Sequence, residues 1–331
     1  MKKFFAGLLA IVCCLSSFGC FGLGDKSNDL TVYMPDGAPA LAFAKLMHED
    51  TEGDGFEYKV VSPTVIKTKV TYKDDSKNAD LCVLPLTAAT KLLGSGESYQ
   101  MLATVTHGNL YLISKDDSVS YAAENIHSLK GKTIGVLQLN EVPGLVLKTV
   151  LSKLGVAYQE NGESVADKVS LIPITGAQDV GALTGVDLYL LAEPAVSAQA
   201  MKGFKIVGDL QTLYGGENGY PQAVLVIKKS VIAKDWGRVY AWLEKLETAH
   251  EWLTSATATE IVTAVTAHLE DTTYASSLKA PLLTGAVLSR CGVWYQYSTA
   301  AMPEVKAFIT AAQVVNKNMA TMPKDEFFYQ K

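Results

Sequence analysis

Arginine is almost absent from this sequence. Only two of the 29 basic residues in the 331-residue chain are arginines, Arg238 and Arg290. The formal net charge is −5, and the chain has no cluster of basic residues of the kind that binds a phosphate backbone. We therefore expect no nucleic-acid partner.

Cysteine is scarce as well. Three of the five cysteines lie in the first 20 residues, which leaves Cys82 and Cys291 in the rest of the chain. Cys82 lies in an apolar run, where a cysteine is usually a small buried hydrophobic residue, and a disulfide between the two is the alternative. No Cys or His spacing is typical of a metal site, and no nucleophile elbow or phosphate-binding loop occurs. We therefore expect no metal, no cofactor and no catalytic residue.

Long hydrophobic runs are missing too. The N-terminal apolar run covers residues 4–15, which is too short to span a membrane comfortably. It follows Lys2 and Lys3 and leads to small residues ending at Cys20, the order of a secretory signal. The stretch resembles a bacterial lipobox. This resemblance implies that residues 1–20 are a signal peptide, that Cys20 carries a lipid anchor, and that residues 21–29 form a tether.

Beyond residue 29, strand-like and helix-like segments alternate. Thr31–Met34 is typical of a strand, the next three residues of a turn, and Pro39 of the first residue of a helix. The same order recurs at residues 80–93, where Pro85 stops an apolar run and Thr87 is the expected cap of a helix. This alternation predicts an α/β protein with parallel-type sheets flanked by helices.

A polar interval at residues 115–125 divides the chain into two alternating blocks. The apolar runs 110–113 and 223–227 bracket the second block, and we expect them to form the two crossings of a hinge. Helical spacing dominates after residue 229, which predicts a helical tail without strands that packs on the first lobe. The predicted lobe 1 contains residues 30–113 and 224–331, and lobe 2 contains residues 114–223.

Five motifs occur in an order that resembles a known family. They are Pro35-Asp36-Gly37-Ala38-Pro39-Ala40, residues 79–85 with Ala88-Ala89, residues 129–136, residues 192–195 and residues 220–223. Together they resemble the substrate-binding lipoproteins of bacterial ABC importers, in the branch related to thiamine-pyrimidine and aliphatic-sulfonate (nitrate/taurine-type) binding proteins. The resemblance covers the chain from about Asp29 to Lys331.

This resemblance implies a two-lobed periplasmic-binding-protein-like fold of type II. It also implies a small-molecule ligand between the lobes, an ABC permease in the membrane as partner, and no enzymatic activity. We expect a monomer, anchored by lipid to the outer side of a bacterial membrane. Two other functions stay open: an enzyme on the same fold, similar to pyrimidine synthases or dehydratases, and a ligand-sensing surface lipoprotein.

In open parallel sheets, ligands bind beyond the carboxyl ends of the strands, where helix N-termini point. Residues at such strand ends, in the glycine-rich loop 215–221 and at the rare arginine of the tail are therefore predicted to bind the ligand. They are Asp36, Gly37, Ala38, Thr87, Ala88, Thr106, His107, Asn140, Glu141, Glu193, Asn218 and Arg290.

Several of these residues have a structural alternative. Asp36 binds the ligand or completes its turn, His107 binds it or is solvated in a loop, and residues 140–141 cap a helix instead. Glu193 binds a ligand amine or has a structural partner. Arg290 binds an anionic group or joins the tail to the first lobe through a carboxylate. The shortage of arginine favours a neutral or mildly polar heterocycle or a similar metabolite, although helix N-termini alone can bind a monoanion.

Overall fold

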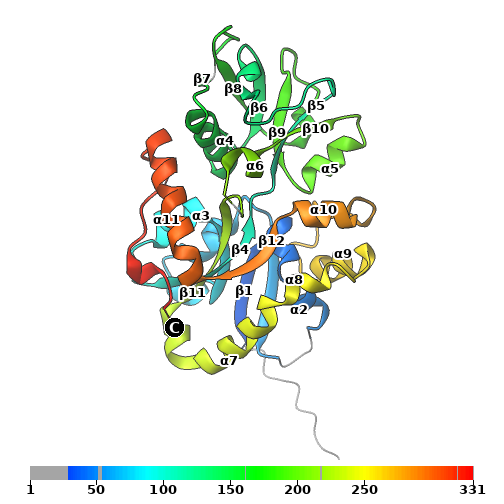
Figure 1. Ribbon diagram of the computed structural model, residues 1–331. Helices are drawn as coiled ribbons and strands as arrows, with labels where there is room; N and C mark the ends of the chain where they lie inside the picture. The colour runs from blue at the N-terminus through cyan, green and yellow to red at the C-terminus, as the bar shows by residue number, and fades with distance from the viewer. Residues whose placement is uncertain (1–28, 51–53, 161, 217, 319, 331) are drawn as a thin grey trace, which may run out of the picture.

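The computed structural model describes residues 29–50, 54–160, 162–216, 218–318 and 320–330. The predicted signal peptide, the anchor Cys20 and nearly all of the predicted tether lie outside these residues. The described chain forms two lobes, each built on a six-stranded sheet flanked by helices (Figure 1). Within the described residues, no helix is both long enough and apolar enough to cross a membrane.

The first lobe is built on a sheet with the strand order β12-β4-β11-β3-β1-β2. β1 runs parallel to β2 and β3, whereas β11 is antiparallel to both β3 and β4, and β12 is antiparallel to β4. The strands are β1 Leu30–Pro35, β2 Phe56–Val61, β3 Leu81–Pro85, β4 Tyr99–His107, β11 Pro221–Lys228 and β12 Val293–Tyr297.

The second lobe is built on a sheet with the order β10-β5-β9-β6-β8-β7. Its β6, β7, β8 and β9 run parallel, and β5 is antiparallel to β9 and β10. The strands are β5 Leu110–Ser114, β6 Thr133–Leu137, β7 Tyr158–Glu160, β8 Val169–Ile174, β9 Leu188–Ala192 and β10 Lys205–Asp209. Both sheets are therefore mixed. The predicted parallel character holds for the βα units of each sheet. It fails for β5 and β11, which enter their sheets from the other lobe, and for the edge strand β12.

Helices cover both sheets (Figure 1). The α-helices are α1 Ala38–Leu41, α2 Ala44–His48, α3 Leu86–Leu93, α4 Val142–Lys153, α5 Ala195–Ala200, α6 Leu210–Tyr214, α7 Lys229–Glu247, α8 Ala249–Trp252, α9 Ala258–Thr266, α10 Gly285–Arg290 and α11 Ser298–Val315. Short 3-10 helices are η2 Ile66–Val70, η3 Asp75–Lys77, η4 Ile126–Leu129, η5 Ala177–Asp179, η6 Ala280–Leu282 and η7 Asp325–Phe327.

The chain passes between the sheets twice. The first crossing is Gly108-Asn109, between β4 and β5, and the second lies between α6 and β11. The apolar runs that were expected to be the crossings are instead strands: residues 110–113 belong to the second sheet and residues 223–227 to the first. An apolar run becomes buried in a sheet, and a short glycine-containing link makes the passage. If each strand is assigned to the lobe of its own sheet, the predicted lobe borders shift by a few residues. The division into domains stays a prediction.

The tail differs from its prediction in two respects. It contributes β12, an aromatic-rich edge strand paired with β4, where helices alone were expected. Its last helix, α11, packs on α4 of the second lobe as well as on β4 and β11 of the first. Phe308 of α11 lies 6.1 Å, between ring centroids, from both Tyr214 and Tyr220. One face of the hydrophobic core is therefore continuous across the two lobes.

Candidate ligand-binding site

The sheet topology brings strand ends of both lobes to one boundary. β4 leads directly into β5 through two residues, and β1 and β3 run in the same direction as β4, so their carboxyl ends face the second lobe. In the second lobe Leu110 at the start of β5 pairs with Ala192 at the end of β9, and β6 runs parallel to β9. We call the surface where these carboxyl ends meet the interlobe boundary (Figure 1).

Glu193 and Arg290 form an ion pair across this boundary. Arg290 Nε donates to Glu193 Oε1 at 2.7 Å, and the Glu193 side chain is fully buried whereas that of Arg290 is 31% exposed. Ser197 donates to both carboxylate oxygens, from its amide at 3.1 Å and from its hydroxyl at 2.9 Å. Arg290 Nη2 in turn donates to Ser197 Oγ at 3.1 Å. The structural partner of Glu193 is therefore Arg290, which joins the tail to the second lobe and not to the first.

His107 lies at the end of β4 beside the first crossing. Its ring stacks on Trp294, with centroids 3.6 Å apart and planes 12° apart, and its Nε2 lies 3.4 Å from Gln296 Oε1. The side chain is buried, and Nδ1 has no hydrogen-bond partner among the described residues. Burial lowers the pKa of His107 to about 4. The imidazole is therefore neutral near pH 7, and it is not the solvated loop histidine of the alternative prediction.

Asp36 is a buried anchor of a distant loop. Its carboxylate accepts hydrogen bonds from Ser276 Oγ and from the Ser277 amide, both at 2.6 Å, and from the Tyr274 hydroxyl at 3.4 Å. The side chain thus does more than complete its own turn. Of its two neighbours, Gly37 has a φ of 102°, which favours glycine, and Ala38 is buried in the core.

Three predicted residues lie inside regular elements of the first lobe. Thr106 is buried in β4 between Ala223 and Val293 of the flanking strands. Thr87 and Ala88 are buried in the first turn of α3, which begins at Leu86 and has Pro85 as its N-cap. The prediction that Thr87 caps this helix is wrong. The helix starts two residues earlier than expected, at Leu86. Proline can occupy its N-cap because this position needs no backbone N–H.

The remaining predicted residues are polar and accessible. Glu141 is the N-cap of α4, but its side chain makes no capping bond and instead pairs with Lys67 of η2, with Nζ and Oε1 2.7 Å apart. This second ion pair also joins the two lobes. Asn140 is exposed, and the exposed Asn218 lies 3.5 Å from Glu304 Oε1 of α11.

Four residues at the boundary were not predicted: Lys67, Ser197, Trp294 and Gln296. Ser197 lies one helical turn after Glu193, a spacing that would have indicated the contact once a helix at this place was expected. The other three contact predicted residues only through the tertiary structure, so no local signal marks them.

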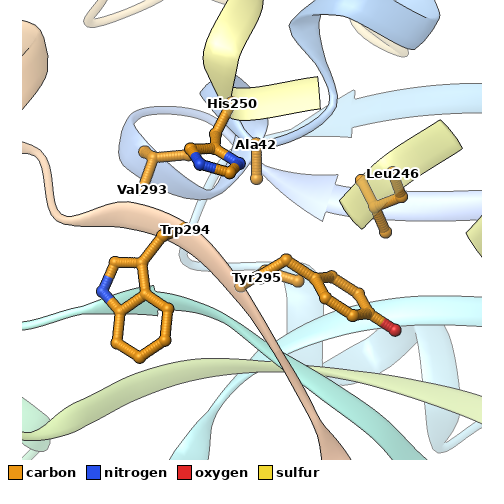
Figure 2. Close-up of a pocket in the computed structure, with 7 residues that line it drawn as sticks. Ala42, Leu246, His250, Val293, Trp294 and Tyr295 are labelled. Carbon is orange, nitrogen blue, oxygen red and sulfur yellow. The ribbon is translucent and has the colours of Figure 1, made fainter. Parts of the chain in front are cut away.

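Two cavities of the first lobe differ in size. A pocket of about 10 Å³ lies between α1, α7 and β12, where Trp294 and Tyr295 line it together with His250 (Figure 2). It could hold at most about one water molecule, so it is no ligand site. A larger cavity of about 330 Å³ opens at the carboxyl end of β2, with Lys69, Glu270 and Tyr274 among its lining residues.

The cysteines and metal ligands show no reactive arrangement in the described chain. Cys82 and Cys291 are free and buried, so the alternative of a disulfide between them is wrong. Burial raises the pKa of the Cys291 thiol to about 12, and that of Cys82 is raised as well, so both thiols are protonated near pH 7. Among the described residues, no three His, Cys, Asp or Glu side chains are grouped so that they could hold a metal ion.

Comparison with known proteins gives matches in structure only. No protein-family model and no curated protein matches the chain. The crystal structure of an ABC transporter protein from Parabacteroides distasonis superimposes with a TM-score of 0.70 at 19% identity, covering 92% of this chain and 99% of that one. The periplasmic aliphatic sulphonate-binding protein SsuA from Escherichia coli gives a TM-score of 0.64 at 14% identity, covering 92% of each chain.

A third solved structure is the ligand-binding component of an ABC-type import system from Staphylococcus aureus. It gives a TM-score of 0.59 at 13% identity and covers 91% of this chain and 96% of that one. All three structures are named for ABC transport or for the binding of a solute. The chain therefore has the two-lobed type II periplasmic-binding fold that the family resemblance implies.

Proposed function

We propose that this protein is the extracytoplasmic solute-binding component of an ABC importer, which captures a small organic metabolite between its lobes and delivers it to a membrane permease. One observation carries the proposal: carboxyl ends of strands from both sheets meet at a boundary, and two short links of the described chain cross it. Such an arrangement lets two lobes close on a ligand about a hinge. The fold shared with the solved binding components supports it.

The boundary offers hydrogen-bonding groups to such a ligand. Helices α3 and α4 both begin there without a side-chain cap, so their first backbone N–H groups are available. His107 Nδ1 is a buried polar atom without a partner in the described chain. Two ion pairs already join the lobes, and a ligand that contacts both would stabilise the closed form through its higher affinity for that form.

The proposal includes a place for the protein in the cell. We expect Cys20 to carry lipid, residues 21–29 to tether the lobes to the outer side of a bacterial membrane, and the protein to act as a monomer. Release of a Cys20→Ala variant from the membrane fraction would support the anchor, and its full retention there would count against it.

The proposal is tested by identifying what the protein binds. The full chain is extracted from membranes in detergent and denatured, and released small molecules are analysed by mass spectrometry beside an unrelated lipoprotein from the same cells. We expect one compound in near-stoichiometric amount that also raises the Tm of the protein and is recovered unchanged after incubation. A broad metabolite panel without any stabilising compound would refute the proposal, and a chemically converted compound would favour the enzyme alternative.

A further inference from the structure

We propose that the interlobe site takes an uncharged ligand, and that Glu193 is the residue that excludes anionic ones. This inference rests on the proposed function, because it concerns the ligand of that same site. It starts from the charges of the described residues at the interlobe boundary and from the groups that already neutralise them.

The guanidinium at the boundary is already occupied. Arg290 Nε and Nη2 are bound to Glu193 and Ser197, at 2.7 and 3.1 Å. The other arginine of the chain, Arg238, lies in α7 of the first lobe, where it pairs with Asp235. A sulfonate or phosphate that bound the Nε and Nη2 groups of Arg290 through two parallel hydrogen bonds would have to displace Glu193 and Ser197. At Nη1 it would meet a guanidinium whose charge Glu193 already balances.

Displacing Glu193 is unfavourable because its carboxylate is fully buried and held by three donors. Ser197 donates to it from both its amide and its hydroxyl, and Arg290 is its cationic partner. An anion that replaced this pairing would leave a second negative charge buried without a counter-ion. The pair of Arg290 and Glu193 as a whole therefore carries no net charge.

The other predicted site residues do not restore a positive charge. The cation of Lys67 is paired with Glu141. Asp36 is buried and receives its hydrogen bonds from two serines and a tyrosine, which are neutral donors. His107 is neutral near pH 7 because burial lowers its pKa to about 4. Among these residues three carboxylates outnumber two cations, so they supply no net positive charge that would attract an anionic ligand.

What remains for a ligand is a set of hydrogen-bonding groups whose charges are absent or already balanced. Nδ1 of His107 is buried without a partner, and Nη1 of Arg290 makes no hydrogen bond to a described residue. The free N–H groups at the start of α3 add further donors. An uncharged molecule with carbonyl or hydroxyl acceptors and at least one N–H or O–H donor fits this set, such as a polar heterocycle.

The test compares two panels of compounds on the full chain in detergent, by thermal shift and calorimetry. One panel contains uncharged heterocycles and amides, and the other contains ethanesulfonate and methylphosphonate. We expect the wild type to bind an uncharged compound and to show no binding of either anion at millimolar concentration. In Glu193→Gln the amide keeps the side-chain volume but leaves Arg290 without its counter-ion, so we expect ethanesulfonate to bind at least about tenfold more tightly than to the wild type.

Glu160→Gln is the matched control. Glu160 pairs with the buried Lys148 at 2.9 Å, so its substitution also releases a buried cation, but at the β7 edge of the second sheet. A similar gain of sulfonate binding in Glu160→Gln, or no gain in Glu193→Gln, would overturn the assignment of Glu193.

The wild-type panels decide the ligand class even if Glu193→Gln does not fold. Anion binding by the wild type that Arg290→Gln abolishes would overturn this inference and leave the proposed function intact. If the wild type binds no compound of either panel and nothing co-purifies with it, the proposed function fails instead.

Discussion

At the scale of single residues, three of the predicted site residues are ionisable and buried. Asp36, Glu193 and His107 were predicted from their positions at strand ends, and each is almost fully buried. Burial of a charged or polar group is tolerated when other groups satisfy it. The carboxylates have such partners in Ser276 and Arg290, whereas His107 avoids the cost by losing its charge.

The neutral state of His107 predicts a pH dependence of folding. Its pKa falls from an ordinary value of 6.5 to about 4 in the folded protein, so between these values the unfolded chain binds a proton that the folded chain does not. Above pH 6.5 the residue has no effect, and as the pH falls towards 4 it destabilises the fold. We expect the free energy of unfolding to be about 2 kcal/mol lower at pH 5 than at pH 7 from this residue alone.

Urea denaturation at both pH values measures this effect. His107→Gln removes the titrating group and should flatten the pH dependence by that amount. His127→Gln, at an exposed position, is the control and should leave the slope as in the wild type. An unchanged slope in His107→Gln would contradict a buried neutral imidazole.

At the scale of elements, the connection from α10 to β12 positions two side chains of the boundary, the partner of Glu193 and the ring that stacks on His107. It places Arg290 at the end of the helix and Trp294 in the strand, and Gly292 makes the turn between them with a φ of 64°. The Gly292 carbonyl accepts a hydrogen bond from the His107 amide at 2.8 Å. The positive φ and the lack of room for a Cβ make glycine the favoured residue at this turn.

Gly292→Ala is therefore expected to strain this turn. The new Cβ would lie 2.6 Å from the carbonyl oxygen of His107 and 2.8 Å from that of Gly108, in addition to the unfavourable φ. We expect a loss of about 2 kcal/mol or more in the free energy of unfolding. Denaturant unfolding measures it, with Gly285→Ala at the start of α10 as the control.

Gly285 has open space around it and an ordinary φ. Alanine there should leave the stability unchanged or raise it by up to about 1 kcal/mol, because alanine favours the helix. Equal effects of the two substitutions would contradict the close approach at Gly292.

At the scale of the whole molecule, two ion pairs join the lobes at different distances from the hinge. Glu193 is next to the first crossing, since its amide donates to the Asn109 carbonyl at 3.0 Å. Lys67 instead follows β2, the edge strand of the first sheet that is farthest from β4, and its partner Glu141 begins α4. The Lys67 pair therefore has the longer lever arm for holding the lobes together.

This pair is 40% and 44% exposed, so water and salt screen it. We expect Glu141→Gln to weaken binding of the co-purifying ligand by no more than about fivefold, equivalent to about 1 kcal/mol, and mainly at low salt. Calorimetry at two salt concentrations measures the change, and small-angle scattering of the ligand-free protein should give a larger radius of gyration.

The control for this substitution is Asp187→Asn. Asp187 pairs with Lys132 at 3.6 Å within the second lobe, and the two side chains are 40% and 43% exposed. The control should change neither the affinity nor the radius of gyration. The same change in both variants would mean that loss of surface charge, and not the link between lobes, is responsible.

The sequence by itself determined the fold class, the two alternating blocks and the strand ends that meet at the boundary. Apolar runs, turn residues and a proline at a helix start are local signals that need no knowledge of distant contacts. The same signals assigned two strands as crossings and missed β12. The apolar pattern of a short segment does not distinguish a link between lobes from an edge strand or a central strand.

Only the tertiary structure decided which charges the predicted site presents. Glu193 and Arg290 are 97 residues apart, and Lys67 and Glu141 are 74 apart, in different lobes. Periodicity encodes which face of an element is buried, but it does not encode which side chain of another lobe meets it. The sequence left Arg290 open between an anionic ligand and a structural carboxylate, and the shortage of arginine already favoured a neutral ligand. The fold pairs Arg290 with Glu193, which supports the proposal of an uncharged ligand.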